Sequence, residues 1–300
     1  MIISASYKTD IPAFYGDWFL KRLDAGFVRT VNPYSRQIQT VPLTRETVDG
    51  FVFWTRNVEP FLGVLDAVRR RGFPFVIQYT VTAYPGALDR STIPAERVIR
   101  HLHVLSRTYG PAVAVWRYDP VILTSLTPLD WHVDTFTRLS RTIAGAVDEV
   151  VLSFAHIYRK TARNLGAAAR LHGFQWSDPS AQEKAALLSR LAAVAADHRL
   201  KASLCGQPEL LAPGLSEARC IDAERMERAA GHAIKAAHKP HRVRCGCFAS
   251  RDIGDYDTCP HGCVYCYAVA SRERAKAGLA RHRPDGESLV TPAWKGQAGS

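Results

Sequence analysis

The sequence predicts an α/β fold built on a parallel β-sheet, in the form of a partial, TIM-like (β/α)6 barrel. Two observations lead to this prediction. Six short apolar runs recur along residues 1–206, and longer segments with one apolar face separate them. A doubly wound sheet is the alternative, but no glycine-rich turn follows the first run, as dinucleotide-binding sheets of that kind require.

The expected strands are nearly continuous apolar runs. Such runs are typical of strands that are buried on both faces of a parallel sheet. They cover residues 2–6, 51–55, 75–80, 112–117, 149–154 and 201–204. Residues 28–41 additionally predict a hairpin, inserted after the first helix, that turns at Asn32 and Pro33.

The segments between the strands are amphipathic. Their apolar residues recur at helical spacing, as Phe61, Leu65 and Val68 do, so each segment presents one apolar face. Pro94 precedes one segment and Gly110 follows it, which is the usual punctuation of a helix. The expected helices cover residues 58–71, 95–108, 132–145 and 181–198.

Composition places the chain among globular proteins. Of its 300 residues 47% are hydrophobic and 22% are charged, which allows a large core. No stretch reaches the roughly 18 apolar residues of a membrane span, and the first residues lack the basic region of a signal peptide. We therefore expect a soluble cytoplasmic protein with no membrane partner. Its expected parts are the barrel (1–206), a cysteine-rich iron–sulfur segment packed on the carboxyl rim of the barrel (207–280) and a loose tail (281–300).

The net charge makes nucleic acid an alternative partner. The chain has 39 Lys and Arg against 28 Asp and Glu, which gives +11. Clustered basic residues bind nucleic acid because they release counterions from phosphate. Here the basic residues are spread out, and the densest run, residues 69–71, ends an amphipathic segment, where cations favour the helix dipole.

Polar side chains gather where the expected strands end. Parallel α/β folds bind their ligands at the carboxyl ends of the strands, so these side chains predict a pocket. Asp10, Asn57, Arg117 and Asp119 are the candidate catalytic residues, and the guanidinium of Arg117 suits a carboxylate or phosphate. Structural alternatives remain: Arg117 and Asp119 as an ion pair that holds a loop, and Asp10 as the cap of the first helix.

Cysteine gives the strongest chemical signal. Seven cysteines in a chain without a secretion signal favour metal or redox chemistry over a disulfide framework. Five of them lie between residues 245 and 266, and Cys259, Cys263 and Cys266 form a Cys-x3-Cys-x2-Cys motif with Tyr265 before its last member. Three thiolates hold three irons of a 4Fe–4S cubane and leave the fourth iron open to a small molecule.

This motif resembles that of the radical S-adenosylmethionine superfamily, a Cys-x3-Cys-x-aromatic-Cys loop on a partial barrel of six βα units. The resemblance implies a 4Fe–4S cluster on Cys259, Cys263 and Cys266, with Tyr265 near the adenine of S-adenosylmethionine. It also implies that S-adenosylmethionine chelates the open iron and is cleaved reductively to a 5′-deoxyadenosyl radical. An electron donor such as flavodoxin or ferredoxin would then be a partner.

Two features depart from the superfamily pattern. The cysteine loop follows the sixth expected strand, whereas the superfamily usually carries it after the first. No clear Gly-Gly-Glu motif follows the second strand, where Thr55, Arg56 and Asn57 stand instead. By their position, Thr55 and Arg56 become candidate cofactor-binding residues.

Over nearly its full length the chain resembles a second family, domain of unknown function 1848. The resemblance rests on residues 9–15, 53–57, 116–120 and 220–222 and on the terminal cysteine block. It implies the same fold and cofactor but supplies no reaction.

Four cysteines lie outside the motif, namely Cys205, Cys220, Cys245 and Cys247. Four is the ligand number of a closed 4Fe–4S cluster, so we hypothesise an auxiliary cluster for electron relay or substrate anchoring. The alternative is that Cys205 and Cys220 are buried small apolar residues. Zinc is the competing metal, and its site would combine Cys247 with the three cysteines of the motif, with His241 or His261 as substitutes.

Three functional hypotheses follow. The first is an enzyme that cleaves S-adenosylmethionine reductively and abstracts hydrogen from a small-molecule or macromolecular substrate, with Cys205, Tyr7 or Tyr118 moving a hydrogen atom or proton. The second is a zinc- or iron–sulfur-stabilised protein that binds or repairs nucleic acid. The third is a zinc-folded module that binds a partner and catalyses nothing.

Overall fold

The protein is built around one parallel sheet of eight strands. The computed structural model describes all residues except 33–34, 36, 241–244 and 291–300. The strand order is β11-β10-β8-β6-β5-β4-β1-β12, and every neighbouring pair in it is parallel. From β1 to β10 the order never reverses, which rules out the doubly wound alternative. The predicted α/β fold with a parallel sheet is confirmed, but the sheet is open, with β11 and β12 at its edges, and is not closed into a barrel.

All six expected strands are present in the middle of the sheet. Their bounds are β1 (Ile2–Ala5), β4 (Gly50–Thr55), β5 (Phe75–Thr80), β6 (Ala114–Val121), β8 (Glu149–Phe154) and β10 (Lys201–Leu204). The edge strands β11 (Ser216–Glu217) and β12 (Ser250–Asp252) are additions that the sequence did not predict. They are too short to show a periodicity of their own.

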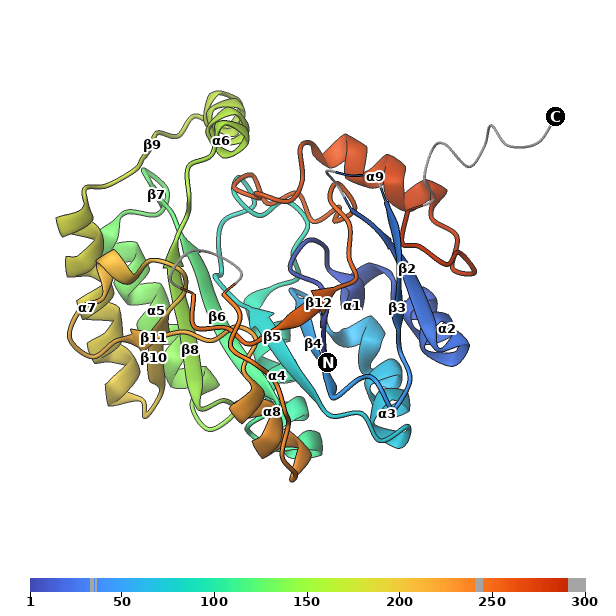
Figure 1. The fold of residues 1–300 in the computed structure, drawn as a ribbon. Coiled ribbons are helices and arrows are strands. Elements are labelled where there is room, and N and C mark those ends of the chain that lie inside the picture. The colour runs from blue at the N-terminus through green and yellow to red at the C-terminus, as the bar shows by residue number, and fades with distance from the viewer. Residues whose placement is uncertain (33–34, 36, 241–244, 291–300) are drawn as a thin grey trace.

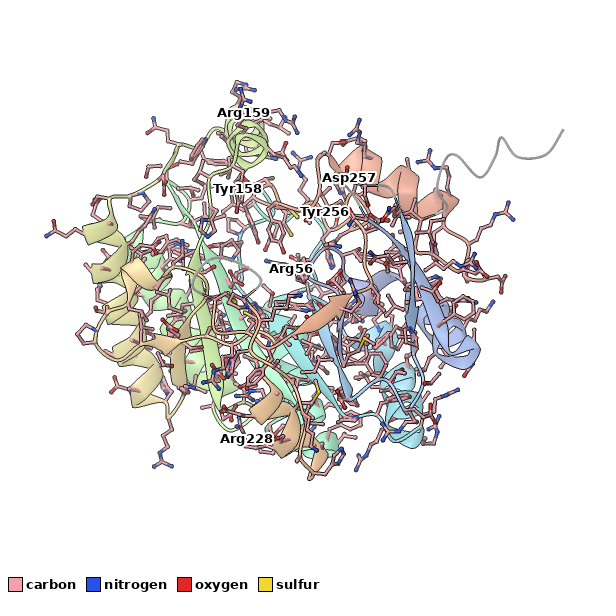
Figure 2. The ribbon with its side chains drawn as sticks, in the orientation of Figure 1. Arg56, Tyr158, Arg159, Arg228, Tyr256 and Asp257 are labelled. Atoms are coloured by element: carbon pink, nitrogen blue, oxygen red, sulfur yellow. The ribbon has the colours of Figure 1, made fainter. Side chains whose placement is uncertain are left out.

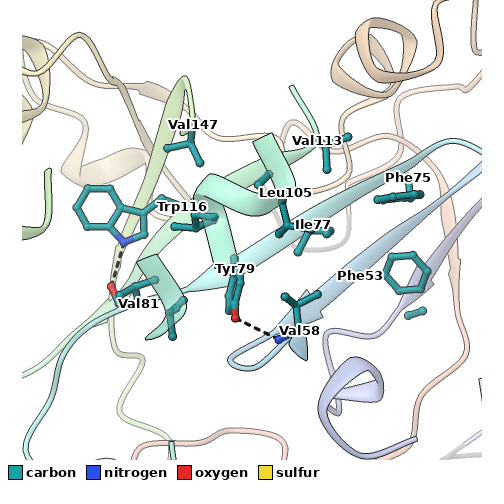
Figure 3. Close-up of a cluster of buried hydrophobic side chains, with 14 of the residues drawn as sticks. Phe53, Val58, Phe75, Ile77, Tyr79, Val81, Leu105, Val113, Trp116 and Val147 are labelled. Carbon is teal, nitrogen blue, oxygen red and sulfur yellow. Dashed lines mark hydrogen bonds between the residues drawn. The ribbon is translucent and has the colours of Figure 1, made fainter. Parts of the chain in front are cut away.

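Helices cover one face of the sheet (Figure 1). All four expected helices are present: a 3-10 turn (Glu59–Phe61) that leads into α3 (Leu62–Arg70), then α4 (Ala95–Tyr109), α5 (Leu129–Ile143) and α7 (Ala181–Asp197). Aromatic and branched side chains fill this core. Two of its buried polar groups are paired within it: Trp116 Nε1 donates to Val81 O at 3.0 Å, and Val58 N donates to the Tyr79 hydroxyl at 3.1 Å (Figure 3). The remaining helices are α1 (Ile11–Phe14), α2 (Gly16–Ala25), α6 (Arg159–His172), α8 (Ala223–Ala230), α9 (Arg272–Arg281) and a second 3-10 turn (Pro208–Leu210).

The opposite face of the sheet, which we call the inner face, is covered by the chain itself. Because side chains alternate along a strand, Val52, Val76 and Val115 point to this face while their neighbours point to the helices. Residues between 218 and 248, including α8, pack against them, as the orange segment in front of the sheet in Figure 1 shows. The approach is close: a Cβ at Gly50 would lie 2.3 Å from Met226 Sδ of α8.

Two small antiparallel pairs and the C-terminal segment complete the fold. The expected hairpin is present as β2 (Phe27–Val31) and β3 (Ile38–Pro42), although Pro33 of its turn lies outside the described residues. The strands β7 (Leu123–Thr124) and β9 (Trp176–Ser177) form the other pair. The expectation of a loose tail is wrong for residues 282–290, because Leu289 is buried in the core and Trp18 Nε1 donates to Gly286 O at 2.8 Å. Residues 291–300 of that tail lie outside the described residues.

Candidate functional site

The three cysteines of the motif lie on one loop between β12 and α9 and face one cavity. Cys259, Cys263 and Cys266 all line this cavity, which has a volume of about 190 Å³. All seven cysteines of the chain are free thiols, as expected for a chain without a disulfide framework. We call residues 254–270 the three-thiol loop.

Local backbone geometry shapes the three-thiol loop. Gly262, directly before Cys263, has φ +79°, which favours glycine, and a Cβ there would lie 2.7 Å from Arg272 Cδ. At the end of the loop, Ala268 N donates to Cys266 Sγ at 3.4 Å, and the carboxylate of Asp257 accepts a hydrogen bond from the backbone of Ala270. The motif therefore folds into a compact turn that directs its thiols to one side.

A buried group of polar side chains ties the three-thiol loop to the carboxyl ends of β4 and β5. Arg56 donates to Asp89 at 2.7 Å and to the Tyr265 hydroxyl at 2.5 Å, and this hydroxyl donates to Asp89 at 2.6 Å. Val264 N donates to Leu88 O at 3.0 Å, beside the backbone bridge between Asp89 and Cys263. Burial raises the pKa of Tyr265 well above its usual value, so the ring stays a neutral donor. Figure 2 shows Arg56 near the centre of the molecule, beneath Tyr158 and Tyr256 in that view.

A second tie joins the loop to the end of β1. His261 lies between two motif cysteines, and its Nε2 donates to Asp10 Oδ2 at 2.8 Å. Arg56 N donates to the same oxygen at 2.8 Å, while Asp10 Oδ1 accepts from Ala13 N at 2.9 Å and so caps α1. The expected capping role of Asp10 is confirmed. Both ring nitrogens of His261 face oxygen atoms, the other being Ser91 O, which makes His261 unsuited to replace a cysteine as a metal ligand.

The electrostatics of the cavity suit a metal-bound set of thiolates. Burial raises the pKa of Cys259, Cys263 and Cys266, and Asp10 adds to the effect at Cys259, whereas Arg56 opposes it at Cys263. Three buried thiolates without a cation would be unfavourable, and a metal centre offsets this cost because a coordinating thiol is deprotonated outright. Three sulfur donors on one cavity therefore fit an iron–sulfur cluster with three protein ligands.

The same group fits a single metal ion poorly. Among the residues that the structure describes, no set of three or more His, Cys, Asp or Glu side chains is arranged to hold one metal ion. The thiolates of a cubane cluster each bind a different iron, so they need not converge on one point. The donor arrangement is therefore compatible with a cluster of several irons at this loop.

The other four cysteines meet on the inner face of the sheet. Cys205 follows β10 and Cys220 follows β11, and their sulfur atoms lie 3.1 Å apart. The thiol of Cys247 interacts with the thiols of both Cys220 and Cys245. We call these cysteines the four-thiol group. The zinc alternative that combined Cys247 with the motif is not the arrangement found, and His241 lies outside the described residues.

Arg117 connects the four-thiol group to the predicted strand-end residues. Its guanidinium donates to Cys220 Sγ at 3.2 Å and to Gln78 Oε1 at 3.1 Å, and its Nε and Nη2 both donate to Asp119 Oδ2 in an ion pair. It also lies 5.0 Å from the centre of the Trp54 ring. Asp119 in turn accepts a hydrogen bond from Ser153. The expected structural ion pair is thus present, and it lies at the centre of the inner face.

The remaining candidates have local roles in the structure. The Thr55 hydroxyl accepts from Asn57 N at 2.9 Å, and Asn57 Oδ1 accepts from Glu59 N at 3.2 Å, which orders the turn that leads into α3. Tyr118 does not face the carboxyl edge: it is fully buried on the helix side of the sheet, hydrogen-bonded to His132. It is therefore excluded as a hydrogen or proton shuttle.

Sequence reasoning missed two buried carboxylates. Asp89 lies in the loop after β5, and Asp252 on β12 accepts from Ser4, from Ser6 and from Tyr7 N at 2.8–3.1 Å. Burial raises the pKa of Asp252. The length of the loop between β5 and α4 was the available signal for Asp89, because long loops at the functional edge of a sheet commonly carry function. No pattern marked Asp252, whose partners are almost the whole chain away.

Fold and site together define a class: an α/β protein with an open parallel sheet that carries two separate groups of cysteines, one at its carboxyl edge and one on its inner face. The chain belongs to the family described as Domain of unknown function (DUF1848), whose model matches residues 2–268. Neither the curated proteins nor the solved structures contain a match to the chain. None of the helices in the described part of the chain is long and apolar enough to cross a membrane.

Proposed function

We propose that the protein is an iron–sulfur enzyme of the radical S-adenosylmethionine type, in which the open sheet acts as a partial barrel and residues 207–280 as its cluster-binding segment. The observation that carries the proposal is that Cys259, Cys263 and Cys266 line one cavity at the carboxyl edge of the sheet. When bound, a cluster with three protein ligands supplies an electron and one open iron site for S-adenosylmethionine.

The residues around the three-thiol loop would keep its cysteines in place. Arg56, Asp89 and Tyr265 form a closed set of charge-assisted hydrogen bonds, which are shorter and stronger than neutral ones. Tyr265 is held by its hydroxyl and packs its ring edge against Tyr84, with ring centres 5.8 Å apart. In this proposal Arg56 serves the cofactor indirectly, as a positioning residue for Tyr265.

The wall of the cavity offers groups for a chelating cosubstrate. Arg90, Asn164 and Arg272 line it together with the cysteines. Guanidinium groups bind carboxylates by paired hydrogen bonds, and an amide can both donate and accept. We assign to these side chains the amino-acid part of S-adenosylmethionine, which carries a carboxylate and an amine.

The substrate would lie toward Arg117 and Asp119. Both lie on β6 in the middle of the sheet, and the side chain of Asp119 keeps a fifth of its surface accessible while Arg117 is buried. Such a pair can orient a polar substrate through Asp119 without moving the guanidinium. The nucleic-acid alternative rests on the net charge of +11 alone. A flavodoxin or ferredoxin donor and a reducing cytoplasmic setting remain parts of the proposal.

The test is anaerobic reconstitution with iron and sulfide, followed by reduction with dithionite in the presence of S-adenosylmethionine. We expect 5′-deoxyadenosine to form and the electron paramagnetic resonance signal of the reduced cluster to change when S-adenosylmethionine binds. Cys263→Ser should abolish both. Arg228→Ala is the control, because Arg228 is exposed on α8 at the opposite end of the molecule (Figure 2). A fully loaded cluster that neither cleaves S-adenosylmethionine nor changes its signal would refute the proposal.

A further inference from the structure

The four-thiol group is assembled from segments that are distant in sequence. Cys205 lies at the end of β10, Cys220 follows β11, and Cys245 and Cys247 follow α8. The sulfur atoms of Cys205 and Cys220 nevertheless lie 3.1 Å apart, and the thiol of Cys247 interacts with the thiols of Cys220 and Cys245. Unrelated buried cysteines would not be expected to meet in this way from three separate segments.

Neighbouring N–H groups donate hydrogen bonds to two of these sulfur atoms. Arg117 Nη1 donates to Cys220 Sγ at 3.2 Å, and Ile221 N donates to Cys247 Sγ at 3.5 Å. The Arg117 guanidinium is already paired with Asp119, and a thiolate at Cys220 would give it a second charge partner. Hydrogen bonds from N–H groups to sulfur ligands are also the usual support of a metal–thiolate centre.

The group is largely enclosed: Cys220 and Cys247 are buried, and Cys205 and Cys245 are half-buried. It lies between the inner face of the sheet and residues of the 218–248 segment such as Ile221 and Phe248. The cavity that reaches Cys245 has a volume of only about 10 Å³. A centre bound here would have all its coordination positions filled by the protein, which is typical of structural or electron-transfer sites.

We propose that Cys205, Cys220, Cys245 and Cys247 are the protein ligands of a second metal centre, separate from the three-thiol loop and fully coordinated by thiolates. On binding, each thiol releases its proton to solvent and exchanges its sulfur–sulfur contact for a metal–sulfur bond. The guanidinium of Arg117 offsets part of the resulting negative charge. The thiolate chemistry is common to a zinc ion and to a 4Fe–4S cluster. Because no set of three or more donors among the described residues converges on one metal ion, zinc would require the four sulfurs to draw together, and the experiment separates the two.

The experiment uses the full chain carrying Cys259→Ser, Cys263→Ser and Cys266→Ser, purified without oxygen and reconstituted once with iron and sulfide and once with zinc. We expect this triple variant to retain either about four iron and four sulfide per chain, or about one zinc. Adding Cys220→Ser or Cys247→Ser should lower the retained metal at least about tenfold, whereas adding Arg228→Ala should not. A triple variant that retains neither iron with sulfide nor zinc, while keeping the circular dichroism spectrum of the unmodified chain, overturns the proposal.

A second measurement covers variants that fail to fold. In the unmodified chain, alkylation by iodoacetamide followed by mass spectrometry should find the four thiols protected until a chelator removes the metal. Equal alkylation before and after chelation would count against the second centre. The outcome can be told apart from a failure of the proposed function. If the three-thiol loop binds no metal but the four-thiol group does, the triple variant and the unmodified chain retain the same amount of metal.

Discussion

The two groups of cysteines reach similar chemistry by opposite routes. The three-thiol loop takes its sulfurs from one short turn and faces a cavity of about 190 Å³, whereas the four-thiol group draws on three segments and adjoins a cavity of about 10 Å³. Charged hydrogen bonds to Asp10, Arg56 and Asp89 tie the loop to the sheet edge. Apolar packing on the inner face and one guanidinium hold the other group. The cysteines beside the larger cavity are therefore held by polar side chains, and those beside the smaller cavity are held mainly by apolar packing.

The largest expected effect concerns the anchor of the four-thiol side. Arg225 on α8 is buried and contacts Glu149 at 2.8 Å and Asp148 at 2.7 Å. Arg225→Met leaves the buried Glu149 with its hydrogen bond from Ser203 but without its charged partner, so the free energy of unfolding should fall by about 3–5 kcal/mol in urea denaturation. If different contacts hold the four-thiol group and the three-thiol loop, Arg225→Met should increase thiol labelling of Cys220 more than that of Cys263. Arg225→Lys, which keeps the charge, should lose less, and equal losses would contradict the assignment.

A slightly smaller effect should appear on acidification, on the side of the three-thiol loop. His132 Nε2 donates to Ile122 O, its Nδ1 accepts from the Tyr118 hydroxyl, and its ring contacts Tyr84, which packs on Tyr265. Burial lowers the pKa of His132 to about 4. Because the unfolded chain, with a pKa near 6.5, binds the proton first, the free energy of unfolding should fall between about pH 6.5 and pH 4, by about 3 kcal/mol in total.

The measurement for this prediction is urea denaturation of the protein and of His132→Gln across that pH range. The variant should be less stable at pH 7, and the difference between the two proteins should shrink as the pH falls. A larger increase in thiol labelling at Cys263 than at Cys220 at pH 5 would support the coupling of His132 to the three-thiol loop. A pH-independent difference would show that His132 is not held neutral in the folded state.

A third change weakens the attachment of the three-thiol loop only. In Asp10→Asn, the amide oxygen can keep the cap on Ala13 N, but the amide N–H groups then face the donors Arg56 N and His261 Nε2. Retention of metal on the loop should fall about 10–100-fold, as is usual when an outer partner of a metal site is lost. Asp130→Asn, at a carboxylate whose side chain is 85% exposed, is the control. If Asp10→Asn instead lost metal from the four-thiol group, the prediction that Asp10 supports only the three-thiol loop would be wrong.

The smallest effect compares rates of metal loss in one protein. Since the loop faces a cavity of about 190 Å³ and the four-thiol group adjoins one of about 10 Å³, a chelator should remove metal from the loop about tenfold faster, a barrier difference of about 1.4 kcal/mol. Stopped-flow absorbance with the cysteine variants as references assigns the two phases. A single phase would mean that access does not distinguish the two regions.

Local patterns were reliable where the chain folds against near neighbours. The strands β4, β5 and β8 lie within a residue of their expected bounds, and Asp10 caps α1 as the sequence predicted. Apolar runs predicted the strands because a strand of this sheet is buried on both faces. Amphipathic segments predicted the helices because each helix buries one face. By contrast α8 was missed: it has only eight residues, and its packing under Gly50 depends on a contact far away in sequence.

Site residues divide in the same way. The motif that carries Cys259, Cys263 and Cys266 is readable because its spacing is itself the geometry of one turn. Asp89 and His261 were not read as partners of Arg56 and Asp10, because those pairs form only when the loops at the sheet edge meet. The expected tail was likewise mistaken at Leu289, whose burial depends on docking against α2 and the hairpin.

The sequence by itself determined the parallel α/β class, the order of six strands and helices, and the three-cysteine turn, since each depends on periodicity or on residues close together along the chain. Only the tertiary structure decided that the sheet stays open, that its inner face is covered by residues of the 218–248 segment, and that four scattered cysteines touch beside Arg117. These features depend on contacts between distant segments. Such contacts form when apolar surface is buried and buried charges find partners, and neither requirement leaves a local pattern in the chain.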